Sequence, residues 1–184
     1  QGCARDRVFS TDDGRLDVAY IPAMTVRLQR EDFDAAAEAA ALTRGRTDVG
    51  AVVTFTGLCR GAESGEPIAA LILEHYPGMA EEEISRHVED AKSRWPLLGV
   101  TVIHRYGRIE PGQNIVLVVT ASSHREAAFA AAEFLMDYLK TRAPFWKQVE
   151  SAQGRNWVDA KATDDRAADR WGRSDTKPSN QAAQ

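Results

Sequence analysis

The order of the expected strands and helices is the feature that most constrains this fold. Runs of β-branched and aromatic residues predict strands, and apolar residues at helical spacing predict helices. The strands come in pairs between helices, which favours an α+β fold with antiparallel or mixed sheets over a doubly wound parallel sheet. Strands are expected at 25–28, 50–56, 68–76, 100–106, 115–120, 145–150 and 157–160, and helices at 33–42, 80–95 and 123–140.

The helix at 123–140 has the clearest signals at both ends. Ser123 followed by Glu126 predicts a capping box at its start. Leu135 and Leu139 belong to an apolar face, and Pro144 forces the end.

The length of 184 residues leaves room for one compact domain. We place it at 20–173, because the polar, aperiodic segments 1–19 and 174–184 are typical of a flexible N-terminal tail and a disordered C-terminal tail. Since the sequence begins with Gln1, we expect its first residues to be an expression remnant or an incomplete start.

Charge and cysteine content exclude several classes of protein. A net charge of -4 argues against a general polyanion binder, although a small anion can still be bound locally. Cys3 and Cys59 are too few for a disulfide framework, and the four histidines are scattered, so we expect no metal site. With no apolar run approaching about 20 residues and no secretory signal in the first 13, the expected location is the cytoplasm.

The segment 137–147 (DYLKTRAPFWK) carries the strongest chemical signal. Lys140 lies on the last helical turn and Lys147 on the extended segment after the proline, so the two can converge on one pocket. Neighbouring cations and partial desolvation would lower the pKa of such a lysine, making it a base, acid or nucleophile. The alternative is structural: cations complement the helix dipole, and Phe145 and Trp146 are core.

Two other places offer cations to an anion. His124 and Arg125 begin a helix, where cations are unfavourable unless an anion binds the free backbone N–H groups; the alternative is that both point into solvent. Arg60 lies in the loop after the strand at 50–56, with Cys59 beside it as a possible sulfur-carrying nucleophile or a small buried hydrophobe. Arg105 and Arg108 are weaker candidates.

These motifs together resemble the large, catalytic subunit of molybdopterin synthase, from about residue 50 to 171. The matching segments are GAVVTFTG (50–57), LEHYPGM (73–79), VTVIHR (100–105), SHR (123–125) and MDYLKTRAPFWK (136–147).

The resemblance implies an α/β hammerhead with an added β subdomain. It also implies an enzyme that converts cyclic pyranopterin monophosphate into dithiolene-bearing molybdopterin. The sulfur would come from a thiocarboxylate on the C-terminal Gly-Gly tail of a small ubiquitin-like partner. The implied assembly is a heterotetramer with a dimer of large subunits at its centre.

The resemblance also assigns roles to single residues. Lys140 is expected to be the principal acid/base or transient acyl acceptor, and Lys147 to contact the substrate and the tail carboxylate. Arg60, His124 and Arg125 are expected to hold the pterin phosphate. Because a thiocarboxylate is already a good nucleophile, no cofactor or metal is expected. Two further residues are expected to form apolar walls: Phe55 and Met136.

Two departures from the family pattern and three alternatives accompany this hypothesis. Leu58 stands where some relatives carry lysine. Asn156 separates Arg155 from Trp157, whereas the family pattern has a basic residue directly before the tryptophan.

The alternatives are a Cys59 persulfide sulfurtransferase, a non-catalytic receptor for a ubiquitin-like tail, and a single-stranded nucleic-acid binder that stacks bases on Trp146.

Overall fold

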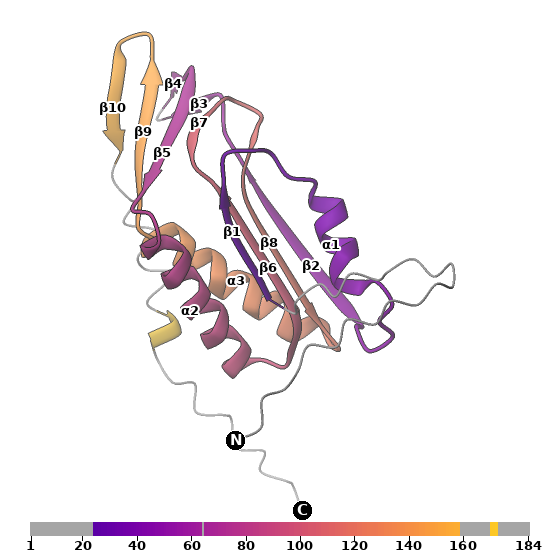
Figure 1. The fold of residues 1–184 in the computed structure, drawn as a ribbon. Helices are drawn as coiled ribbons and strands as arrows, with labels where there is room; N and C mark the ends of the chain where they lie inside the picture. Colours follow the sequence, from indigo (N-terminus) through magenta and orange to yellow (C-terminus); the bar gives the residue numbers. More distant parts are fainter. Residues whose placement is uncertain (1–23, 64, 159–169, 173–184) are drawn as a thin grey trace, which may run out of the picture.

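The computed structural model describes residues 24–63, 65–158 and 170–172. Within these ranges the chain forms two four-stranded sheets, three α-helices and a small hairpin (Figure 1). The expected tails at 1–19 and 174–184 lie outside the described residues. The strands are β1 (Met24–Gln29), β2 (Ala51–Leu58), β3 (Ala62–Glu63), β4 (Glu66–Pro67), β5 (Ala70–His75), β6 (Leu97–Arg105), β7 (Gly107–Ile109), β8 (Asn114–Ser122), β9 (Phe145–Ser151) and β10 (Gly154–Val158), and the helices are α1 (Ala35–Thr43), α2 (Met79–Arg94), α3 (Arg125–Thr141) and the 3-10 turn η1 (Arg170–Gly172).

The larger sheet is mixed and has the strand order β1-β6-β8-β2. Strand β1 runs parallel to β6, whereas β8 is antiparallel to both β6 and β2. The second sheet, β10-β9-β5-β7, is antiparallel throughout. The expected α+β fold with mixed and antiparallel sheets is therefore confirmed.

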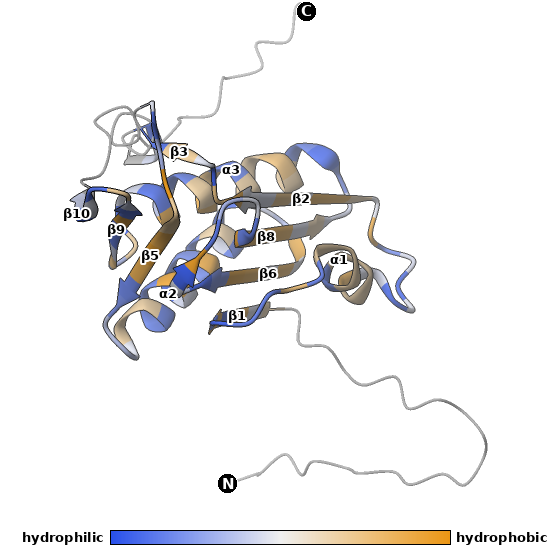
Figure 2. Ribbon diagram, turned by 90° about the horizontal axis from the view of Figure 1, so that it is seen from above, coloured by the Kyte–Doolittle hydropathy of each residue, from blue (hydrophilic) through white to orange (hydrophobic). Residues whose placement is uncertain are grey.

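Both faces of the larger sheet are covered by helices. On β6, Val100 and Val102 pack toward α2 and α3, whereas Ile103 packs on the opposite face beside α1. On β8, Val118 and Leu117 divide between the two faces in the same way. Because side chains alternate along a strand, a strand covered on both faces must be apolar at nearly every position. In Figure 2, β6 and β8 are accordingly coloured mostly as hydrophobic.

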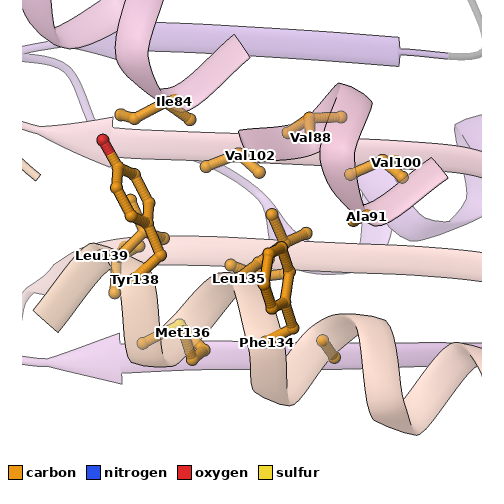
Figure 3. Packing of buried hydrophobic residues seen from close by; sticks show 13 residues of the cluster. Ile84, Val88, Ala91, Val100, Val102, Phe134, Leu135, Met136, Tyr138 and Leu139 are labelled. Atoms are coloured by element: carbon orange, nitrogen blue, oxygen red, sulfur yellow. The ribbon is translucent and has the colours of Figure 1, made fainter. Parts of the chain in front are cut away.

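Helix α2 buries the stripe that its sequence predicts. Ile84, Val88 and Ala91 are nearly inaccessible and pack against α3 and the sheet, where Phe134 and Leu135 meet them (Figure 3). Its acidic residues lie mostly off this stripe, which leaves them as a solvated face.

The second sheet begins where α3 ends. Pro144 follows the helix, β9 starts at Phe145, and in Figure 1 the end of α3 lies beside the start of β9. Strand β9 then pairs with β5 and β10, so the proline turns the chain from the helix layer into the second sheet.

One local expectation, the capping box of Ser123, was wrong. The residue that precedes α3 as its N-cap is His124, and no side chain caps the helix, because Ser123 Oγ donates to the Asp48 carbonyl at 3.2 Å. Arg60 lies, as expected, in the loop after β2, which is short because β2 extends to Leu58 and the hairpin of β3 and β4 begins at Ala62.

Candidate active site

A cavity of about 520 Å³ opens at the junction of the two sheets and the end of α3. This size falls within the usual range for small-molecule sites. Its walls come from the last residues of β2 and the loop after it, from β5, β6 and β8, from the last turns of α3, and from β9. Elements distant in sequence therefore meet at this pocket.

Both lysines singled out by the sequence line this pocket. Lys140 is exposed on the last turn of α3, and Lys147 is half-buried on β9, opposite Leu73 of β5. Because the helix ends before Pro144 and a strand begins after it, one ammonium group approaches from a helix and the other from a strand. The predicted convergence of the two lysines is confirmed.

Arg60 joins the same pocket, and an unforeseen carboxylate links it to Lys147. Glu63 Oε2 accepts a hydrogen bond from Arg60 Nη2 at 2.9 Å, and Glu63 Oε1 lies 3.3 Å from Lys147 Nζ. The Glu63 side chain is only 10% exposed, whereas that of Arg60 is 68% exposed. Of the described residues that line the pocket, three are cations, and one carboxylate bridges two of them.

The predicted apolar walls are present. Phe55 is partly exposed on β2, and Met136 is buried on α3; both line the pocket, together with Leu139 and Phe145. Apolar walls lower the local dielectric and strengthen the field of the cations on any anion that enters.

The pocket also contains His104, to which the sequence analysis gave no role. Its ring stacks on Phe145 with centroids 4.1 Å apart, and Nδ1 lies 2.9 Å from the Arg105 carbonyl oxygen. Burial lowers the pKa of His104 to about 4, so the ring is neutral at pH 7 and Nδ1 is the donor. Strand alternation could have found it, because His104 shares the face of Val100 and Val102.

Cys59 lines the pocket as a buried thiol. Its Sγ lies 3.6 Å from the Ile109 carbonyl oxygen, and burial raises the pKa of the thiol despite the nearby cations Lys147 and Arg60. A raised pKa disfavours the thiolate that a persulfide carrier needs.

His124 and Arg125 do not line this pocket. Both are exposed at the start of α3, whereas Lys140 is at its end. Lys140 is the fifteenth residue after Arg125 in the same helix, which corresponds to about 22 Å at the usual helical rise.

The remaining arginine candidates have structural partners outside the pocket. Buried Arg105 donates to the carbonyl oxygens of Arg30 and Asn114, at 3.0 and 2.9 Å. Arg108 and Arg155 both pair with Glu150 on the second sheet. Among the described residues, no group of three or more His, Cys, Asp or Glu side chains could hold a metal ion.

Comparison with known proteins gives the same family in sequence and in structure. The family described as MoaE protein matches residues 28–142. The molybdopterin synthase catalytic subunit of Mesorhizobium japonicum is 64% identical over 84% of this chain and 97% of its own length. The chain belongs to the MoaE family. The resemblance found in the sequence is therefore confirmed.

Further members of the MoaE family are also close. The molybdopterin synthase catalytic subunit of Rhizobium meliloti is 61% identical over 82% of this chain and 97% of its own length. The solved structure of the molybdopterin biosynthesis MoaE protein from Burkholderia ambifaria aligns with a TM-score of 0.70 at 47% identity, covering 82% of this chain and 99% of that one. The family match includes all of α3 up to Arg142, and hence Lys140, whereas Lys147 follows it.

Proposed function

We propose that this chain is the catalytic subunit of a molybdopterin synthase. It transfers sulfur from the C-terminal thiocarboxylate of a small ubiquitin-like partner to cyclic pyranopterin monophosphate, forming the dithiolene of molybdopterin. The observation that carries the proposal is the convergence of Lys140, Lys147 and Arg60 on one half-apolar pocket. The names of the close relatives support it.

The pocket suits the charges of this reaction. A thiocarboxylate and a phosphate monoester are both anions, and three cations against apolar walls can hold them close together without a metal. A Gly-Gly tail carries no side chains, so it is narrow enough to enter between the two sheets. Phe55 and Met136 would then flank the tail or the pterin ring.

The roles of the lysines follow from their positions. In each transfer a C–S bond forms at a side-chain carbon of the pterin while the C–O bond at that carbon breaks, and its oxygen leaves as water or stays on the phosphate. The acyl C–S bond of the thiocarboxylate then breaks by hydrolysis, and water supplies the oxygen that converts the tail to a carboxylate. Two sulfurs therefore consume two tails. Lys140, which is exposed, serves as acid/base or transient acyl acceptor at the tail carbonyl, and Lys147, which is half-buried, holds the anionic groups.

His124 and Arg125 fit this function only with a second copy of the chain. About 22 Å of helix separates them from Lys140, so they cannot reach the pocket of their own chain. In a symmetric dimer, each copy can offer the start of its α3 to the pocket of the other. We therefore place both residues at the phosphate in the neighbouring copy's pocket.

Among the described helices, none combines the length and apolar character needed to cross a membrane. We propose a cytoplasmic location, which fits an enzyme of molybdenum cofactor biosynthesis.

Reconstitution tests the function directly. The purified chain is mixed with the small subunit in its thiocarboxylate form and with cyclic pyranopterin monophosphate, and the product is followed by mass spectrometry. We expect a product with two added sulfurs and a partner tail converted to carboxylate, and no product with the carboxylate form of the partner. Tail binding without any sulfur in the pterin would instead support the non-catalytic receptor.

A further inference from the structure

Glu63 is an acidic side chain inside a pocket that otherwise gathers cations. It lies in the pocket wall on β3, with a side chain only 10% exposed. Its two carboxylate oxygens have different cationic partners: Oε2 faces Arg60 at 2.9 Å, and Oε1 faces Lys147 at 3.3 Å. The carboxylate therefore occupies the position between two cations where an anionic ligand would be held most strongly.

We propose that Glu63 is an internal substitute for the ligand's anion, holding Arg60 and Lys147 together in the empty pocket and releasing them when the ligand binds. This inference rests on the proposed function for the identity of that ligand, a pterin phosphate or a tail carboxylate. It adds a residue that sets the affinity of the pocket for anions.

The competition follows from charge and space. A phosphate or carboxylate at ion-pair distance from both cations would lie close to the Glu63 carboxylate, and like charges at such a distance repel strongly between apolar walls. The incoming anion can restore both ion pairs that Glu63 gives up. Exchange of one anion for the other thus keeps the cations paired.

Glu63 lies on a very short element of the fold. The hairpin that carries it has strands of two residues each, β3 and β4, which form a two-stranded sheet of their own among the described strands. A pair of strands this short has little stability of its own. Arg60 is 68% exposed, so solvent weakens its ion pair with Glu63 more than it weakens the pair between Glu63 and the half-buried Lys147.

Glu66 provides a matched control. It lies directly across the hairpin from Glu63 and carries the same charge, but it is exposed and does not line the pocket. Glu63→Gln and Glu66→Gln therefore change the net charge equally, and only the first removes the carboxylate between Arg60 and Lys147.

The first test measures the binding of inorganic phosphate to the full chain. The readout is the change in NMR chemical shift of the backbone amides of Arg60 and Lys147. We expect Glu63→Gln to tighten phosphate binding about three- to tenfold and Glu66→Gln to change it less than about twofold. Glu63→Ala repeats the measurement with a smaller side chain. Unchanged or weaker binding by both Glu63 variants overturns the proposal, as does an equal gain in Glu66→Gln.

The second test uses the reconstituted reaction with the thiocarboxylated partner. Glu63→Gln is expected to lower KM for the pterin substrate without lowering kcat. A fall in kcat together with weaker phosphate binding would show that Glu63 instead orients the two cations, and would overturn the proposal. If the unaltered chain makes no product, the proposed function fails, while the phosphate titration still decides the role of Glu63.

Discussion

Replacing His104 with glutamine should remove part of the protein's loss of stability at acidic pH. The His104 ring is buried between β6 and Phe145, and burial lowers its pKa from 6.5 to about 4. The nearby ring of His75 lowers the pKa further, whereas the hydrogen bond to the Arg105 carbonyl raises it. Folded protein therefore keeps His104 neutral in a range where the unfolded chain binds a proton.

The direction and the size of the change in stability with pH follow from this difference in proton binding. Because the folded-state pKa is the lower one, stability is unaffected well above pH 6.5, declines as the pH falls from 6.5, and levels off below about 4. Each pH unit in that window is equivalent to about 1.4 kcal/mol, so going from pH 7 to pH 5 costs about 2 kcal/mol through His104 alone.

Urea unfolding followed by tryptophan fluorescence at pH 5, 6 and 7 measures this effect. His104→Gln lowers the free energy of unfolding at every pH, because glutamine cannot stack on Phe145. The quantity to compare is therefore the fall in the free energy of unfolding between pH 7 and pH 5. We expect that change to be about 2 kcal/mol smaller in His104→Gln than in the unaltered chain. His124→Gln, at an exposed ring, controls for removal of a histidine. Equal pH dependence in His104→Gln and the unaltered chain would refute the reasoning.

Three further predictions concern packing, the thiol and the dimer. Gly50→Ala should lower the free energy of unfolding by about 1–3 kcal/mol in urea unfolding, because a Cβ there would run into the Ser123 carbonyl oxygen; unchanged stability would contradict the packing of β2 against that turn. Cys59→Ala should keep sulfur transfer within about twofold of normal, since a buried thiol with a raised pKa is a poor nucleophile; abolished turnover with an intact fold would revive the persulfide hypothesis. Mixed dimers of Lys140→Ala and Arg125→Ala chains should recover about a quarter of normal activity after subunit exchange, because one pocket of each mixed dimer is complete; no recovery would show that the two residues do not meet across copies.

The sequence predicted the main elements because their signals are local. The strands at β6 and β8 are marked by apolar runs, and α2 by its periodic stripe. Strand β7 had no such signal: Gly107–Ile109 pairs with Leu71–Leu73 of the second sheet, more than 30 residues away in sequence. A pairing of this kind depends on tertiary structure and leaves little trace in a short segment.

Part of the candidate site could be predicted from the sequence. Lys140 and Lys147 could be brought together from the proline between them, and strand alternation could have added His104. Glu63 could not be placed from sequence, because its contacts depend on how a short hairpin folds back over Lys147. The distance of Arg125 from Lys140, in contrast, follows from the length of one helix.

Single-turnover sulfur transfer by Lys140→Ala tests the central claim most directly. The variant is loaded with thiocarboxylated partner and cyclic pyranopterin monophosphate, beside Lys92→Ala, which removes a lysine whose ion pair with Glu89 lies on the surface of α2. We predict that Lys140→Ala binds the partner and melts normally but transfers sulfur about 100-fold more slowly or not at all, while Lys92→Ala is normal. Transfer at a near-normal rate by Lys140→Ala would contradict the assignment of this pocket as the catalytic centre.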